Sequence, residues 1–279
     1  MLAEALGGDA AVIAVELRPP RAELGSLEGM DAWIDSYHEI RRLARQRVPV
    51  FLTDSAVGTQ EENNLRHLIT NLGRELPLEL VTPFLTSKHS LEFCLSYAEQ
   101  ASQQGFTSLV VLGGDISVGR PRCVEHAWDL RQAIRRREPR LSLGGWANPH
   151  ASAVKQVDFL LDPRFCAEFY LTQVVSHLGL DPVKRFLDEV SRRQVPIPGM
   201  FNVFYYRSAN ATTLATLSRF MPVPVEGLVK EFASGATAVD VCAGTLRAMR
   251  ALGVRHFCIC NLPMHDAAST LAAIVDKAR

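Results

Sequence analysis

Several apolar runs of the 279-residue sequence are interrupted or ended by polar side chains that could do chemistry. Glu16 lies inside the first run, Asp115 follows a run that ends in two glycines, and Gln173 ends another. A carboxyl group that is partly removed from water has a raised pKa, which suits a general acid near neutral pH. We therefore expect Glu16 to be catalytic, while pairing with Arg18 or Arg21 is the structural alternative.

The segment Gly113-Gly114-Asp115 has the composition of a ligand contact. Glycines permit close approach of the backbone to a ligand, and a carboxylate accepts hydrogen bonds from the N–H groups of a heterocycle. The structural alternative is a turn after a strand, capped by the aspartate. A G-x-G-x-x-G fingerprint and a Walker lysine are both absent, so this is not a phosphate-binding motif.

Three more side chains could read a planar ligand. The amide of Gln173 both donates and accepts hydrogen bonds, so it can read a pterin or an amide face, although a buried glutamine is often structural. Tyr205 and Tyr206 follow a later apolar run, where an exposed ring could stack on the ligand; such rings also occur in cores.

Metal and disulfide chemistry are not indicated by residue spacing. The six cysteines form no C-x-x-C pair, and the histidines show no H-E-x-x-H or H-x-x-x-H spacing. Cys258 and Cys260 would share one face of a strand, where free cysteines behave as small buried hydrophobic residues. We expect no metal site and no disulfides, as in a reducing compartment.

Short β-branched runs alternate along the chain with stretches of helical period. Eight strands are expected: 12–17, 48–52, 78–85, 108–112, 141–146, 169–175, 197–204 and 257–260. Helices are expected at 32–47, 91–104, 123–137, 182–193, 211–220, 236–252 and 266–277. Eight strands over about 250 residues match a single (β/α)8 TIM barrel better than a doubly wound sheet. Since there is no linker and no internal repeat, we expect one domain over residues 1–279. In such a barrel, the carboxyl ends of the strands would gather the polar residues named above.

Charge and composition exclude several classes of protein. Thirty basic and 30 acidic residues give a formal net charge of zero, which lacks the electrostatic footprint of a nucleic-acid binder. Hydrophobic residues make up 47% of the chain, so it can bury a large core. No apolar run approaches the length of a membrane span and no signal peptide is evident, so we expect a cytoplasmic protein. Exposed helical faces on such a barrel would be compatible with a homo-oligomer.

Seven short motifs, in order, resemble the methylenetetrahydrofolate reductase family. The family's F-E-F-F-P-P-K/R, P-H-L-T-C, L-R-G-D-P-P, A-Y-P-E-x-H-P-E, I-T-Q, P-G-I and G-V-x-x-x-H-F-Y-T-L-N are similar to residues 15–21, 83–87, 112–115, 145–150, 171–173, 198–200 and 253–262. The resemblance implies a (β/α)8 barrel that binds FAD at its mouth. It also implies hydride transfer from NAD(P)H to 5,10-methylenetetrahydrofolate, with no nucleic acid or membrane as partner.

The resemblance also implies roles for individual residues. Glu16 matches the general acid, and Asp115 matches an aspartate near both flavin and pterin. Gln173 matches a folate contact, and Tyr206 falls where the family has a stacking phenylalanine. Residues implied to contact the cofactor are Gly114, Asp115, Trp146 and His150.

Departures from the family pattern fall on the flavin side. Phe84 stands where the family has a histidine, and Gly113 replaces an arginine near the phosphates. Each lost charge-assisted bond to a pyrophosphate would cost about 1.5–3 kcal/mol, unless Arg120, Lys155 or Arg164 compensates. Hydride could therefore come from bound FAD or directly from nicotinamide. The alternative function is a folate-binding barrel without reductase activity, acting as a carrier, a regulatory partner or a methyl-transfer component.

Overall fold

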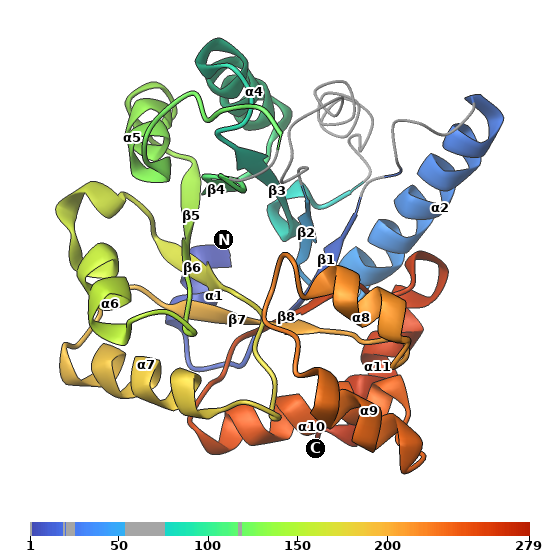
Figure 1. The fold of residues 1–279 in the computed structure, drawn as a ribbon. Coiled ribbons are helices and arrows are strands. Elements are labelled where there is room, and N and C mark those ends of the chain that lie inside the picture. Colours follow the sequence, from blue (N-terminus) through green and yellow to red (C-terminus); the bar gives the residue numbers. More distant parts are fainter. Residues whose placement is uncertain (1, 19, 21–25, 54–75, 117–118) are drawn as a thin grey trace.

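A computed structural model describes residues 2–18, 20, 26–53, 76–116 and 119–279. Eight strands pair in sequence order, all in parallel, and the last pairs with the first to close a barrel (Figure 1). They are β1 (Ile13–Leu17), β2 (Val50–Leu52), β3 (Val81–Thr86), β4 (Ser108–Leu112), β5 (Ser142–Ala147), β6 (Phe169–Thr172), β7 (Gly199–Phe204) and β8 (Phe257–Cys260). The predicted (β/α)8 TIM barrel is confirmed.

Helices surround the barrel (Figure 1). They are α1 (Leu2–Gly7), α2 (Ser26–Arg45), α4 (Leu91–Gln104), α5 (Ala127–Arg137), α6 (Ala153–Leu161), α7 (Asp181–Arg192), α8 (Ala211–Leu217), α9 (Val225–Ala233), α10 (Ala238–Ala251) and α11 (Ala267–Lys277). Three of them, α1, α6 and α9, were not expected from the sequence. Each has nine or fewer residues, so its helical period is weak, although α8, with seven residues, was expected.

Local chemistry explains where the elements begin and end. The hydroxyl of Ser90 caps α4 by accepting a hydrogen bond from the backbone N–H of Phe93. Gly105 ends that helix in the left-handed conformation, with φ of 104°. The predicted strand 78–85 begins later, because Leu78–Leu80 forms a single 3₁₀ turn before β3. The predicted strand 169–175 ends early at Thr172, and Val175 makes only an isolated bridge with Val203.

Alternation along the strands divides inward from outward side chains. The inward set forms one apolar cluster inside the barrel, made of Ala14, Phe51, Phe84, Val110, Phe169, Leu171, Met200, Cys258 and Cys260 with Leu2 and Leu6 of α1. A Cβ at Gly144 would lie 2.7 Å from the ring of Phe169, so this glycine makes room for the ring. His256, directly before β8, bonds to the backbone of Leu6, which places α1 at the amino ends of the strands.

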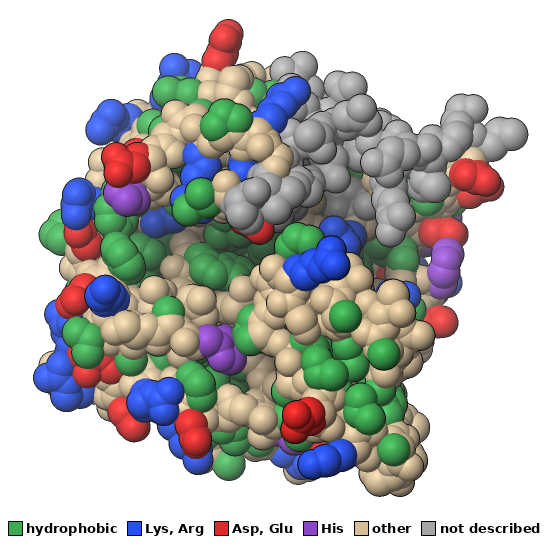
Figure 2. Space-filling view, viewed as in Figure 1, with side chains coloured by type: hydrophobic (Ala, Val, Ile, Leu, Met, Phe, Trp, Pro, Cys, Tyr) green, Lys and Arg blue, Asp and Glu red, His purple; other side chains and the backbone are tan. Residues whose placement is uncertain are grey.

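The face of the molecule drawn in Figure 2 is hollowed near its centre. On the face in Figure 2, hydrophobic side chains gather in the hollow near the centre and charged side chains lie mainly around the periphery. Among the described residues, no helix is both long enough and apolar enough to cross a membrane.

Candidate active site

Glu16 lies at the centre of the candidate site. It faces the barrel interior near the carboxyl end of β1, paired in register with Phe51 of β2 on one side and Cys260 of β8 on the other. The thiol of Cys260 donates a hydrogen bond to Oε2 of Glu16 at 3.0 Å. The carboxyl group therefore sits between an apolar ring and a thiol, and it is partly exposed toward the mouth.

Burial raises the pKa of Glu16 above its ordinary value. The hydrogen bond from Cys260 and the charge of Arg18 act in the opposite direction, but their effect is smaller. A raised pKa keeps a larger fraction of the carboxyl protonated near neutral pH, which a proton donor requires. The charge of Arg18 thus acts on Glu16, as the alternative of a structural pairing would require, but it does not cancel the rise in pKa caused by burial. The other partner considered for that pairing, Arg21, lies outside the described residues.

The segment after β4 carries Gly114 and Asp115, at the same end of the barrel as Glu16. Gly114 has φ of 71°, a left-handed conformation that favours glycine. Its carbonyl accepts a hydrogen bond from the guanidinium of Arg122. That guanidinium also lies over Gly113, where an added Cβ would meet its central carbon at 2.7 Å. A cation from farther along the chain thus lies against both glycines.

Lys88 extends this cationic region. It follows β3, is buried, and donates from Nζ to the carbonyl oxygen of Arg120 at 2.8 Å. Lys88 and Arg122 line a pocket of about 440 Å³. Nε of Arg122 is buried and has no hydrogen-bond partner within the described part of the chain. A phosphate or carboxylate oxygen is the acceptor that such a group requires.

His150 and Gln173 lie at the mouth and are engaged with its backbone. Nε2 of His150 contacts the carbonyl oxygen of Val174 at 2.8 Å, which joins the loops after β5 and β6. The side-chain oxygen of Gln173 accepts from the backbone N–H of Val174. The amide NH₂ of Gln173 makes no hydrogen bond to the residues described and can donate to a ligand. Trp146, near the end of β5, is half-buried against the interior cluster.

Tyr206 follows the carboxyl end of β7, and its side chain does not belong to the interior cluster. Its ring is 5% exposed and packs in a separate cluster with Leu214, Leu228 and Val241. Phe204 lies between the two clusters, half-buried, and pairs in register with Cys260. The rings of Phe204 and Tyr206 are 4.9 Å apart. Substrate stacking by Tyr206 remains a prediction, and Phe204 is the better-placed ring.

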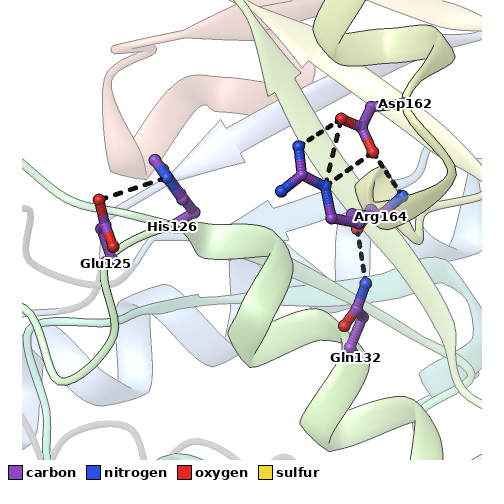
Figure 3. Close-up of polar contacts among 5 residues, drawn as sticks. All are labelled: Glu125, His126, Gln132, Asp162 and Arg164. Atoms are coloured by element: carbon purple, nitrogen blue, oxygen red, sulfur yellow. Dashed lines mark hydrogen bonds and ion pairs between the residues drawn. The ribbon is translucent and has the colours of Figure 1, made fainter.

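Two of the three cations expected to compensate on the flavin side lie elsewhere. Arg164 forms a two-pronged ion pair with Asp162 (Figure 3). Its guanidinium also stacks on Trp128 of α5, outside the barrel. Lys155 is exposed on α6. Arg120 contributes its carbonyl to Lys88, as described above.

A larger pocket, of about 600 Å³, lies between the loop after β6 and the helices α9 and α10. Its histidine, His177, contacts Thr245 through Nδ1 and Glu231 through Nε2, at 2.8 and 2.7 Å. Because both ring nitrogens are engaged, this histidine is held as a link between the loop and the helices. We therefore place the candidate site at the mouth.

Sequence reasoning did not identify Cys260, Phe204, Arg122 or Lys88 as site residues. The inward face of β8 was predicted, since Cys258 and Cys260 were expected to share one face. The contact between Cys260 and Glu16, which are 244 positions apart, follows only once β8 is known to pair with β1. Arg122 and Lys88 carry no motif, and only folding brings them beside Gly113.

Comparisons with known proteins were made by family, by sequence and by structure. No family model matches the sequence, and no curated protein matches it significantly. Among solved structures, the barrel is similar to the "apo-form of a putative deoxyribose-phosphate aldolase" from Toxoplasma gondii ME49, at 10% identity and a TM-score of 0.45. The match covers 99% of this chain and 96% of that one. A likeness this distant carries no argument about function. The (β/α)8 barrel and its polar mouth are consistent with an enzyme.

Proposed function

We propose that this protein is an oxidoreductase similar to methylenetetrahydrofolate reductase. It would reduce 5,10-methylenetetrahydrofolate to 5-methyltetrahydrofolate with hydride from NAD(P)H. The observation that carries the proposal is Glu16, a carboxyl group at the barrel mouth whose pKa is raised by burial. The seven family motifs in chain order support it.

The chemistry requires one proton and one hydride. The proton of Glu16 goes to N10 of the folate while the bond from N10 to the methylene carbon breaks, which leaves an iminium ion at N5. Hydride from the nicotinamide, directly or through flavin, then adds to the methylene carbon and gives the methyl group. Glu16 is left as a carboxylate and regains its proton from solvent through the mouth. The hydrogen bond from Cys260 stabilises that carboxylate between turnovers.

The other residues at the mouth would orient the folate. The amide NH₂ of Gln173 can donate to a pterin acceptor, and Asp115 can accept from pterin N–H groups. Phe204 and Trp146 offer half-buried rings for a planar ligand. These contacts would hold the methylene carbon in place while water is partly excluded.

The residues present fit a dinucleotide pyrophosphate better than an isoalloxazine ring. Arg122 and Lys88 supply cations beside β4, and both FAD and NAD(P)H carry a pyrophosphate. Phe84, at the position of the family's flavin histidine, is 4% exposed and points into the core against Phe51. When bound, FAD would relay the hydride. The buried Phe84 favours direct transfer from nicotinamide.

The test is an assay of the purified protein with 5,10-methylenetetrahydrofolate and NADH or NADPH, with and without added FAD. We expect nicotinamide oxidation that depends on folate and yields 5-methyltetrahydrofolate without added FAD. A requirement for FAD would retain the reductase and overturn direct transfer. Folate binding without nicotinamide oxidation under either condition would overturn the reductase and favour the folate-binding barrel.

A further inference from the structure

Two thiols and a carboxyl group converge inside the barrel. One oxygen of Glu16 and the sulfur atoms of Cys258 and Cys260 all lie within 4.8 Å of one another. Within the described residues, this is the group of side chains that could hold a metal ion. The geometry follows from strand pairing: β8 places both cysteines inward, and Glu16 lies directly beside Cys260 in β1.

The donor set selects the kind of ion. Thiolates favour soft or borderline cations such as Zn²⁺, which bind sulfur at about 2.3 Å and carboxylate oxygen at about 2.0–2.2 Å. Ligand atoms around a tetrahedral ion of this size are about 3.5–4 Å apart. The ligand atoms of the cluster, all within 4.8 Å of one another, are already close to that spacing.

A fourth group lies in the same part of the barrel. Asn202 of β7 pairs in register with Cys258 and lies two positions after Met200, on the same inward face of the strand. It is 1% exposed, and its Oδ1 has no hydrogen-bond partner among the described residues. An unsatisfied buried acceptor is unusual in a core. It could bind a water on the ion or contact the ion itself.

We propose that Glu16, Cys258 and Cys260 form a binding site for a divalent cation of the Zn²⁺ class. On binding, the ion displaces one proton from each thiol and the proton of Glu16 where that carboxyl is protonated, forms two metal–thiolate bonds and one metal–carboxylate bond, and releases about two to three protons to solvent. Three protein ligands leave one tetrahedral position for water or a small ligand, the arrangement of zinc sites that are not purely structural. Since α1 closes the amino ends of the strands, the ion enters by the mouth beside Glu16.

Occupancy has a consequence for the proposed reaction. A carboxylate bound to the ion cannot deliver a proton to the folate, so the ion would inhibit the reduction. This consequence rests on the proposed function, whereas metal binding itself does not. The two can therefore be tested separately.

The experiment is a titration of the reduced protein with Co²⁺, which has the coordination chemistry of Zn²⁺ and a visible spectrum. We expect a thiolate-to-cobalt charge-transfer band that saturates at about one ion per chain, with release of about two to three protons per ion, two from the thiols and the rest from the protonated fraction of Glu16. Added Zn²⁺ should displace the cobalt and abolish the band. A wild-type protein that shows no such band would overturn the proposal.

Variants assign the ligands. The single variants Cys258→Ser and Cys260→Ser should each lose at least half of the band intensity. Glu16→Gln keeps both thiols and should weaken cobalt binding by at least about 10–100-fold, the cost of losing even a group that only supports a ligand. Cys242→Ser is the matched control, because Cys242 is a buried free thiol on α10 outside the cluster. Circular dichroism confirms that each variant is folded. An undiminished band in the single cysteine variants would place the ion elsewhere and overturn the proposal.

Discussion

The two ends of the barrel interior differ in chemistry. Toward the amino ends of the strands, Phe169, Val110 and Met200 fill the interior and α1 closes it with Leu2 and Leu6. Toward the carboxyl ends, the interior carries a carboxyl group, a thiol hydrogen-bonded to it, and the half-buried rings of Trp146 and Phe204. One set of strands thus builds both a packed floor and a polar mouth.

The packed floor and the polar mouth should contribute differently to stability and to activity. A fully packed floor resists changes of volume and makes no contact with solvent. At the mouth, incomplete packing leaves room for a ligand, and partial burial raises the pKa of Glu16. We therefore expect substitutions in the floor to change the free energy of unfolding, and substitutions at the mouth to change rates, binding or pH dependence.

The largest effect is expected for Glu16→Gln. Loss of a general acid lowers kcat by about 10²–10⁴-fold, while folate affinity changes little because the amide keeps the shape of the side chain. Steady-state kinetics and a folate binding titration measure the two quantities. Glu39→Gln is the control, since Glu39 is also buried but accepts hydrogen bonds from Arg42 and the backbone N–H of Ala268, outside the barrel. Equal losses of kcat in both variants would contradict the assignment.

The next largest effect is expected in the floor. Phe169→Ala removes a fully buried ring that fills the space over Gly144, and should lower the free energy of unfolding by about 3–5 kcal/mol. Urea denaturation measures the change. Phe159→Ala is the matched control, because Phe159 is 45% exposed on α6 and its loss should cost far less. If Phe169→Ala reduced kcat of the folded enzyme as strongly as Glu16→Gln does, floor and mouth would not be separate.

A smaller effect separates two neighbouring rings. Phe204→Leu should raise the folate dissociation constant by about 2–10-fold, because one ring contact contributes about 0.5–1.5 kcal/mol. Tyr206→Leu should lower stability and leave folate affinity unchanged, since that ring packs in the separate cluster with Leu228. A binding titration of both variants with folate measures the two dissociation constants and shows which ring contacts the ligand. The reverse order would restore the stacking role predicted for Tyr206 from the family resemblance.

The smallest effect concerns stability as a function of pH. The pKa of Glu16 is raised in the folded state, so the folded protein holds this proton more tightly than the unfolded chain. Wild-type stability should therefore fall as the pH rises from the ordinary value of 4.5 through the raised value, and Glu16→Gln should lack this fall. Denaturation at a series of pH values measures the free energy of unfolding of both proteins. The stability of the variant relative to wild type should increase with rising pH, and this increase should be absent below pH 4.5, the ordinary pKa of a glutamate. A constant difference would mean that burial does not perturb Glu16.

The fold could be predicted because its signals are local. Each strand is a short apolar run, and eight of them alternate with helices. The ends of the strands were predicted less accurately. The apolar run predicts a strand as far as Val175, yet β6 ends at Thr172. Beyond it the chain forms the loop that His150 contacts at Val174. Short helices such as α9 contain too few turns for their period to be recognised.

The site was predictable only where one residue indicates chemistry by itself. A glutamate inside an apolar strand is unusual, so Glu16 could be found. The contact between Glu16 and Cys260 depends on barrel closure, and the placement of Arg122 over Gly113 depends on the path of a loop. Neither is encoded in a local pattern.

The most direct test of the central claim is the pH dependence of kcat for wild type and Glu16→Gln with 5,10-methylenetetrahydrofolate and NADH. A proton donor must be protonated, so the wild-type rate should fall as the pH rises through the raised pKa of Glu16. The variant should be slow and lack that fall. A variant that keeps both the wild-type rate and the wild-type pH profile would contradict the assignment of Glu16 as the acid.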